Sequence, residues 1–185
     1  GDRPRMKRVA DWLRKLDAPP YPFKIDKTLA AQGAPIYKKY CAECHGADGK
    51  DFRGEYSGKV VPIDAIGTDG HRLDSYTYAV AVNQNIIFAE YGDERFSHFR
   101  KTFGYANSPL DGIWLRAPYL HNGSVPTLRD LLEPSAKRPR TFYRGYDVYD
   151  QKNLGFVSDV AEEKGKKFFL YDTDERNEPG NSNKG

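Results

Sequence analysis

The stretch Cys41-Ala42-Glu43-Cys44-His45 decides the fold of this chain. Two thiols three residues apart on one helical turn can reach the two vinyl groups along one edge of a porphyrin, and the next residue places its imidazole under the iron. Thiols supply the thioether bonds, and imidazole supplies an axial nitrogen. The spacing therefore predicts one covalent haem c, attached through Cys41 and Cys44, with His45 as an iron ligand.

Two other chemistries use paired cysteines at this spacing. A redox dithiol normally opens a helix after a strand in a thioredoxin-like unit, whereas a helix-like segment precedes Cys41. A structural zinc site needs four ligands, and the chain has only two cysteines, so five adjacent residues would have to supply three of the ligands. The spacing favours haem attachment over both.

The composition indicates a small core and an ordinary charged surface. Apolar residues make up 38% of the 185 residues, against roughly 45–50% in typical domains, and charged residues make up 30%. A bound macrocycle would give the apolar side chains a surface to pack on. The net charge of +3, from 29 basic and 26 acidic residues, does not indicate a nucleic-acid partner.

The sequence also bears on location. No stretch approaches the roughly 20 apolar residues of a membrane span, and residues 1–15 carry charge without an apolar signal core. Because covalent haem attachment is normally completed outside the cytoplasm, we expect an exported protein that is periplasmic or secreted.

The rhythm of apolar residues predicts an all-α, cytochrome c-like domain with few helices and long loops around one haem. Residues 6–16 have the stripe of an amphipathic helix, which the prolines that follow end. We accordingly divide the chain into a helix and Pro-rich linker (1–22), a cytochrome c domain (23–171) and a polar tail (172–185).

Three helices are predicted inside the cytochrome c domain. The first starts near Pro35, or consists of two helices joined at Gly33, and delivers the cysteines. The second covers residues 74–90. A short third helix starts after the capping residue Thr127 and stops at Pro134.

The second axial ligand stays open at this level. Met6, the only methionine, fits a core or surface position in the amphipathic helix. His71 and His98 fit plain loop or surface histidines better than ligands. His121 lies in the stiff turn APYLHNGSVPT (117–127), which could hold its imidazole near the iron or near a propionate. An open or water-bound position would favour reaction with peroxide or oxygen.

Three further side chains are candidates to bind the haem propionates. Arg72, Trp114 and Arg116 carry guanidinium or indole donors that suit carboxylates in a partly buried site. An ordinary surface ion pair or a core aromatic explains each of them equally well.

Several stretches along the chain belong together. They are FKID (23–26), the stretch 33–46 that ends in CAECHG, IGTD (66–69), GY (104–105), PLDGIWLRAPYLHNGSVPTL (109–128) and GNSN (180–183). This set resembles the C-terminal haem domain of the bacterial di-haem cytochromes that include the haem-containing rubber oxygenases, a group related to the di-haem cytochrome c peroxidases. The resemblance covers nearly the whole chain, and residues 109–128 are its specific part.

The resemblance implies an α-helical cytochrome c fold in a periplasmic or secreted protein. It implies that the residues before Asp17 form the joint to an upstream domain, which in the related proteins carries the oxygen or peroxide chemistry while the C-terminal haem passes electrons. The family pattern continues past residue 185 with a histidine, a further candidate for the second ligand. Only one C-x-x-C-H is present here, so we expect an electron-transfer haem domain rather than a complete enzyme.

These observations lead to one expected function and one alternative. We expect a one-electron carrier that acts as a relay within a larger multi-haem protein, with a redox protein or an adjacent haem domain as its partner. No catalytic residue is assigned. The alternative is a haem enzyme of the peroxidase or dioxygenase type with an open sixth position on the iron.

Overall fold

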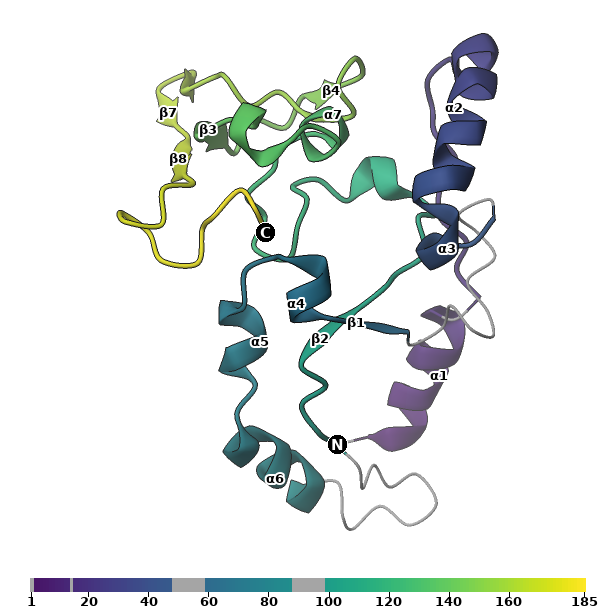
Figure 1. Cartoon of the computed structure of the whole chain (residues 1–185), viewed down its shortest axis with the longest axis vertical. Helices are drawn as coiled ribbons and strands as arrows, with labels where there is room; N and C mark the ends of the chain where they lie inside the picture. The colour runs from purple at the N-terminus through teal and green to yellow at the C-terminus, as the bar shows by residue number, and fades with distance from the viewer. Residues whose placement is uncertain (1, 14, 48–58, 88–98) are drawn as a thin grey trace.

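The computed structural model describes residues 2–13, 15–47, 59–87 and 99–185 (Figure 1). Within these ranges helix accounts for 36% and strand for 16%, so the fold is mixed α/β and the prediction of an all-α domain is wrong. His98 and the last three residues of the helix predicted over 74–90 lie outside the described residues. Most of the long helices lie in the N-terminal half, and the C-terminal third holds short antiparallel strands joined by turns and loops.

The first helices are α1 (Arg3–Leu13) and α2 (Lys27–Tyr40). The carboxylate of Asp26 caps α2 by accepting hydrogen bonds from the backbone N–H groups of Thr28 and Leu29, both at 2.9 Å. The predicted start near Pro35 is wrong, because this cap begins the helix earlier and Pro35 lies inside it. The helix continues through Pro35 although a proline inside a helix is unfavourable, so one continuous helix reaches the cysteines.

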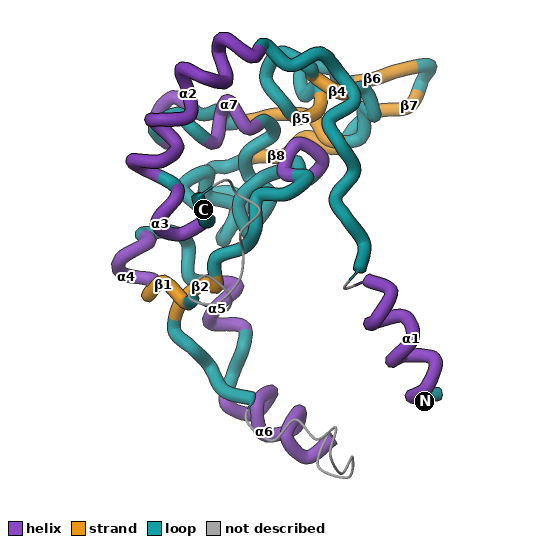
Figure 2. Tube along the Cα trace, turned by 90° about the vertical axis from the view of Figure 1, so that its right-hand side faces the viewer, coloured by secondary structure: helices purple, strands orange, loops and turns teal. Residues whose placement is uncertain are grey.

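The helix α1 confirms the amphipathic segment predicted over residues 6–16, with bounds shifted toward the N-terminus. Its apolar side chains are exposed, from 54% for Leu13 to 65% for Met6. Figure 2 shows α1 standing apart from the other labelled elements. In the described ranges no helix is long and apolar enough to cross a membrane.

The middle of the chain combines short helices with a two-stranded ladder. In chain order the elements are β1 (Val60–Pro62), α4 (Ile63–Ile66), α5 (His71–Ser75), α6 (Tyr78–Ile87) and β2 (Gly104–Ala106). β1 pairs antiparallel with β2, with Val61 opposite Tyr105. Gly104 leaves no room for a Cβ against the carbonyl oxygen of Val61, which explains a glycine at this close approach.

The C-terminal part is built from turns and small antiparallel ladders. Its elements are η3 (Ile113–Leu115), α7 (Leu128–Leu131), η4 (Ser135–Lys137), β3 (Thr141–Arg144), β4 (Tyr149–Asp150), β5 (Gly155–Phe156), β6 (Glu162–Glu163), β7 (Lys166–Lys167) and β8 (Phe169–Asp172). The pairs are β3 with β8, β4 with β5, and β6 with β7. The helix α7 confirms the predicted short helix, since the hydroxyl of Thr127 accepts a hydrogen bond from the N–H of Asp130 at 3.1 Å.

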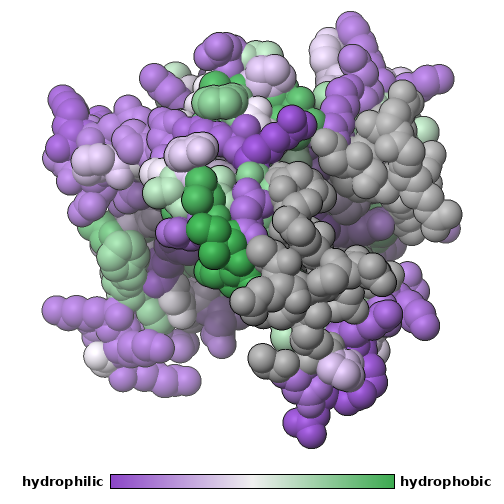
Figure 3. Space-filling view, turned by 90° about the horizontal axis from the view of Figure 1, so that it is seen from below, coloured by the Kyte–Doolittle hydropathy of each residue, from purple (hydrophilic) through white to green (hydrophobic). Residues whose placement is uncertain are grey.

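The buried core lies in this C-terminal part. The aromatic rings of Phe142 and Tyr171, opposite each other in β3 and β8, stack with centroids 4.9 Å apart. Val125, in the segment before α7, is completely buried. By contrast α2 buries none of its residues, and Leu29 and Ile36 are 64% and 60% exposed. Figure 3 accordingly shows apolar side chains reaching the surface among hydrophilic ones. The protein core is thin, as the composition indicated.

Candidate haem site

The two cysteines and the histidine of the motif lie on one turn where α2 passes into α3 (Ala42–His45). The N–H of Cys41 donates to the carbonyl of Tyr37 at 2.8 Å, and the N–H groups of Cys44 and His45 both donate to the carbonyl of Cys41, at 3.2 and 3.0 Å. Both thiols are free, and all three side chains are half-buried. The turn thus presents two thiols and one imidazole from a single rigid piece of backbone.

The imidazole of His45 is held by a residue far along the chain. Its Nδ1 lies 2.9 Å from the carbonyl oxygen of Ser108. Because a carbonyl oxygen only accepts hydrogen bonds, Nδ1 must carry the proton, and the lone pair then resides on Nε2. A second hydrogen bond of this kind is the usual partner of a metal-binding histidine, since it sets the tautomer and the ring orientation.

The backbone of the motif is also fixed from two sides. The hydroxyl of Tyr37 in α2 donates to the carbonyl of Gly46 at 2.9 Å, and the amide of Asn107 donates to the carbonyl of Cys44. Gly46 is buried and has a φ of 83°, a conformation that favours glycine. The sequence after β2 therefore holds the motif against the end of α2.

The residues of the motif fit a covalent haem. The donor set is two free thiols and an imidazole whose Nδ1 is already engaged, and in the described chain no hydrogen bond involves Nε2 of His45. The exposed apolar side chains of α2 lie on the helix that ends at these cysteines. Cys41 and Cys44 would hold the macrocycle, and His45 would supply the axial nitrogen.

His121 lies in a different set of contacts. Its Nε2 is 3.6 Å from Oδ1 of Asp69 and 3.4 Å from the hydroxyl of Tyr105, and its ring stacks on Tyr105 with centroids 4.7 Å apart. Burial lowers the pKa of His121, and Asp69 offsets only part of this effect. No hydrogen bond joins His121 to the C-x-x-C-H turn within the described ranges, and its role as a ligand stays a prediction.

Asp69 is a buried carboxylate that lies between His71 and His121 and was not predicted from the sequence as a site residue. Its side chain is 8% exposed, and Oδ2 pairs with Nδ1 of His71 at 2.5 Å. Burial raises the pKa of Asp69, but hydrogen bonds from His71 and His121 outweigh it and hold the pKa below its ordinary value. The same contact raises the pKa of His71, which is exposed. The stretch IGTD was the one signal that pointed here.

The three candidate propionate donors are in separate surroundings. The guanidinium of Arg116 donates to the carbonyls of Pro109 and Asp111, both at 2.7 Å, and so braces its own loop. The indole of Trp114 donates to the carbonyl of Pro19 at 3.2 Å. Arg72 is exposed, and its charge helps to lower the pKa of His121. Propionate binding by all three stays a prediction.

Part of the chain is similar to a family of known proteins. Residues 104–143 match a family model described as RoxA-like, cytochrome c-like. This match supports the cytochrome c-like family. It covers β2, the segment that holds His45, the turn containing His121, and α7.

Two proteins of Sinorhizobium fredii (strain NBRC 101917 / NGR234) are similar over most of the chain. The protein y4iM is 32% identical over 177 residues, which is 83% of this chain and 39% of y4iM. The protein y4iJ is 32% identical over 210 aligned residues, which is 87% of this chain and 34% of y4iJ. Both are described as uncharacterised. The chain thus spans little more than a third of the length of these relatives.

The turn that carries His121 is hydrogen-bonded to residues 180–182 near the end of the described chain. The amide of Asn122 donates to the carbonyls of Gly180 and Ser182, at 3.0 and 2.8 Å, and the hydroxyl of Tyr171 donates to the carbonyl of Asn122 at 2.9 Å. Sequence reasoning missed these contacts because their partners lie 49 to 60 residues apart.

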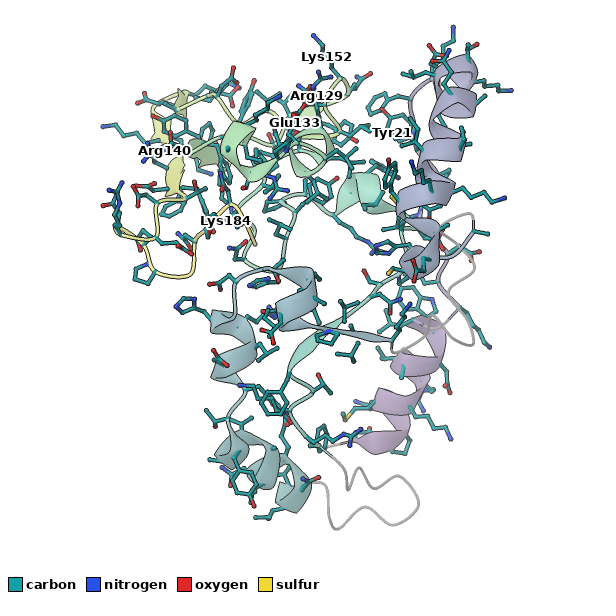
Figure 4. The ribbon with its side chains drawn as sticks, in the orientation of Figure 1. Tyr21, Arg129, Glu133, Arg140, Lys152 and Lys184 are labelled. Atoms are coloured by element: carbon teal, nitrogen blue, oxygen red, sulfur yellow. The ribbon has the colours of Figure 1, made fainter. Side chains whose placement is uncertain are left out.

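Trp114 belongs to an aromatic cluster that anchors the linker before α2. Its ring meets those of Tyr21 and Tyr149 edge-on, at 5.6 and 5.7 Å, and Phe23 stacks on Tyr149 at 5.6 Å. Figure 4 labels Tyr21 on this linker, beside α2. The cluster holds the linker against the C-terminal part, and this contact fixes the position at which α2 begins.

Asp150 closes the β4–β5 turn next to this cluster and provides a pH test. Burial raises its pKa, but hydrogen bonds from the side chain and N–H of Asn153 and the N–H of Lys152 outweigh it, so the pKa lies below its ordinary value. Stability from the carboxylate is therefore fully present above about pH 4 and is lost as the pH falls through the lower, folded-state pKa.

We expect Asp150→Asn to lower the free energy of unfolding by about 1 kcal/mol at neutral pH, because the ionised acceptor is lost. The difference from the unaltered protein should shrink toward about pH 3, measured by urea unfolding at both values. The exposed Asp147→Asn is the matched control. The same pH dependence in both variants would contradict the assignment.

Proposed function

We propose that this chain is a c-type cytochrome domain that transfers single electrons through one haem attached at Cys41 and Cys44. The observation that carries the proposal is the 2.9 Å contact between Nδ1 of His45 and the carbonyl of Ser108, beside two free thiols on the same turn. When bound, the haem supplies an iron that changes oxidation state by one electron.

The chain's own residues perform the remaining tasks. The thiols attach the group to the end of a long helix. The carbonyl of Ser108 keeps the proton of His45 on Nδ1, so that Nε2 carries the lone pair that would bind the iron. Tyr37 and Asn107 restrict movement of the turn that carries them. A rigid site suits electron transfer, since little has to rearrange when the charge changes.

We further propose that the domain is a relay within a larger, exported multi-haem protein. The chain carries a single C-x-x-C-H, and the two curated relatives are more than twice as long as the part they share with it. An adjacent haem domain or a separate redox protein would then deliver and remove the electron. A periplasmic or secreted location follows from the covalent attachment.

The visible and near-infrared spectrum of the purified holoprotein tests this function. We expect sharp low-spin bands, no sulfur-to-iron charge-transfer feature and slow binding of cyanide, which together indicate a nitrogen ligand in the second axial position. A high-spin spectrum with rapid cyanide uptake would support instead the open-iron alternative, a peroxidase or dioxygenase type of enzyme. Absence of a covalently bound haem would refute both.

A further inference from the structure

Two consecutive residues after β2 both reach the C-x-x-C-H turn. The side-chain amide of Asn107 donates to the carbonyl of Cys44, and the carbonyl of Ser108 accepts from the ring of His45. We infer that Asn107 is a positioning residue: it fixes the hydrogen bond between Ser108 and His45 and thereby the reduction potential. The inference rests on the proposed haem function.

Asn107 is itself anchored on the β1–β2 ladder. Its N–H donates to the carbonyl of Lys59 at 3.0 Å, one step beyond the pairing of Val60 with Ala106. The two strands are also tightly packed at the other end of the ladder, because Gly104 lies against the backbone of Val61 with no space for a Cβ. The amide of Asn107 therefore reaches the motif from a fixed base.

The contacts join two pairs of adjacent residues. Asn107 bonds to Cys44, and Ser108 bonds to His45, so each dipeptide is held at two successive points. With one contact, the His45 ring could swing relative to Ser108, since a single hydrogen bond tolerates a wide range of angles. With both contacts, the backbone position of the turn and the ring orientation are set together.

The amide also has a feature that a purely space-filling residue would lack. Oδ1 of Asn107 is buried, and no described residue donates to it. Leaving a buried acceptor without a partner is costly, and an apolar side chain of similar size would avoid that cost. Unlike an apolar side chain, the amide of Asn107 donates a hydrogen bond to the carbonyl of Cys44.

The hydrogen bond to Ser108 links this geometry to the iron. Donation from Nδ1 to a carbonyl makes the imidazole a stronger ligand, which stabilises the ferric more than the ferrous form. If the loss of the Asn107 amide lets the turn drift, that hydrogen bond weakens and the ferric form is less favoured. The reduction potential should then rise.

The experiment compares Asn107→Ala and the similarly sized, uncharged Asn107→Leu, both of which remove the amide donor, with the unaltered holoprotein. The matched control is Asn85→Ala, which removes another part-buried amide; among the described residues, this amide bonds only the backbone of Phe99, at 3.0 and 3.2 Å. We expect a higher reduction potential and a changed pattern of haem-methyl shifts in the proton NMR spectrum for both Asn107 variants. The Asn85 variant should match the unaltered protein in both readouts.

A second readout does not need the haem. In the haem-free protein at a pH where His45 is neutral, its nitrogen chemical shifts should show mainly the Nδ1–H tautomer, and both Asn107 variants should shift toward a mixture. Potentials and tautomer populations that match the unaltered protein would overturn the inference while leaving the proposed function intact. Failure of the unaltered protein to attach haem would instead count against the proposed function.

Discussion

The double variant Cys41→Ala, Cys44→Ala is expected to lose covalently bound haem completely. Both thiols are free and lie on the turn that presents His45, and the chain has no other cysteine. Without thioether bonds, only His45 and apolar contacts would retain the macrocycle. The measurement is haem that stays with the polypeptide after denaturation and acid–acetone extraction, read from the pyridine haemochrome spectrum.

The matched control for this loss is Ser108→Ala. The contact from residue 108 to His45 comes from its backbone carbonyl, so removal of the hydroxyl should leave haem attachment unchanged. Each single cysteine variant should retain one thioether bond and show a shifted haemochrome band. Full haem retention by the double variant would rule out this site of attachment.

The variant Arg138→Ala is expected to cause the largest loss of stability, about 3 kcal/mol or more. The guanidinium donates to four backbone carbonyls: Nε to Asp130 at 3.2 Å and Glu133 at 3.0 Å, Nη2 to Leu131 at 3.1 Å, and Nη1 to Asn183. It caps the end of α7 and also holds the last residues of the chain. Alanine would leave these part-buried carbonyls without their donor.

Equilibrium unfolding in urea, followed by circular dichroism, measures this loss. Arg140→Ala is the control, because its side chain is 75% exposed and forms one ion pair, at 3.0 Å, with Asp174. Such a pair contributes on the order of 0–1 kcal/mol. Arg138→Lys should recover only part of the stability, since one ammonium cannot reach four acceptors. Equal losses in the free energy of unfolding for the two alanine variants would show that the hydrogen bonds of Arg138 do not contribute more than a surface ion pair.

The haem site shows how far local sequence information reaches. The spacing of Cys41, Cys44 and His45 within one turn is a local property, so the attachment motif could be read directly. The cap of α7 by Thr127 was predictable for the same reason, because its partner is three residues away. The partner of the His45 ring is 63 residues away, and nothing in the spacing pointed to Ser108 or Asn107.

The error in fold class has a related cause. The strands β3 to β8 of the C-terminal part have two to four residues each, which is too short to show an alternating pattern of apolar and polar side chains. The ladder between β3 and β8 pairs Thr141 with Asp172, and only the folded chain brings these positions together. Aromatic residues there stack across strands instead of lining a helix.

By itself, the sequence determined the C-x-x-C-H motif, the amphipathic first helix, the short capped helix and the thin core, all of which depend on neighbouring residues or on composition. The tertiary structure decided what surrounds them: the carbonyl that orients His45, the burial of Asp69 against His121, and the tie of Arg138 to the end of the chain. The physical reason is that hydrogen-bond partners distant in sequence are selected by packing, and no local pattern encodes them.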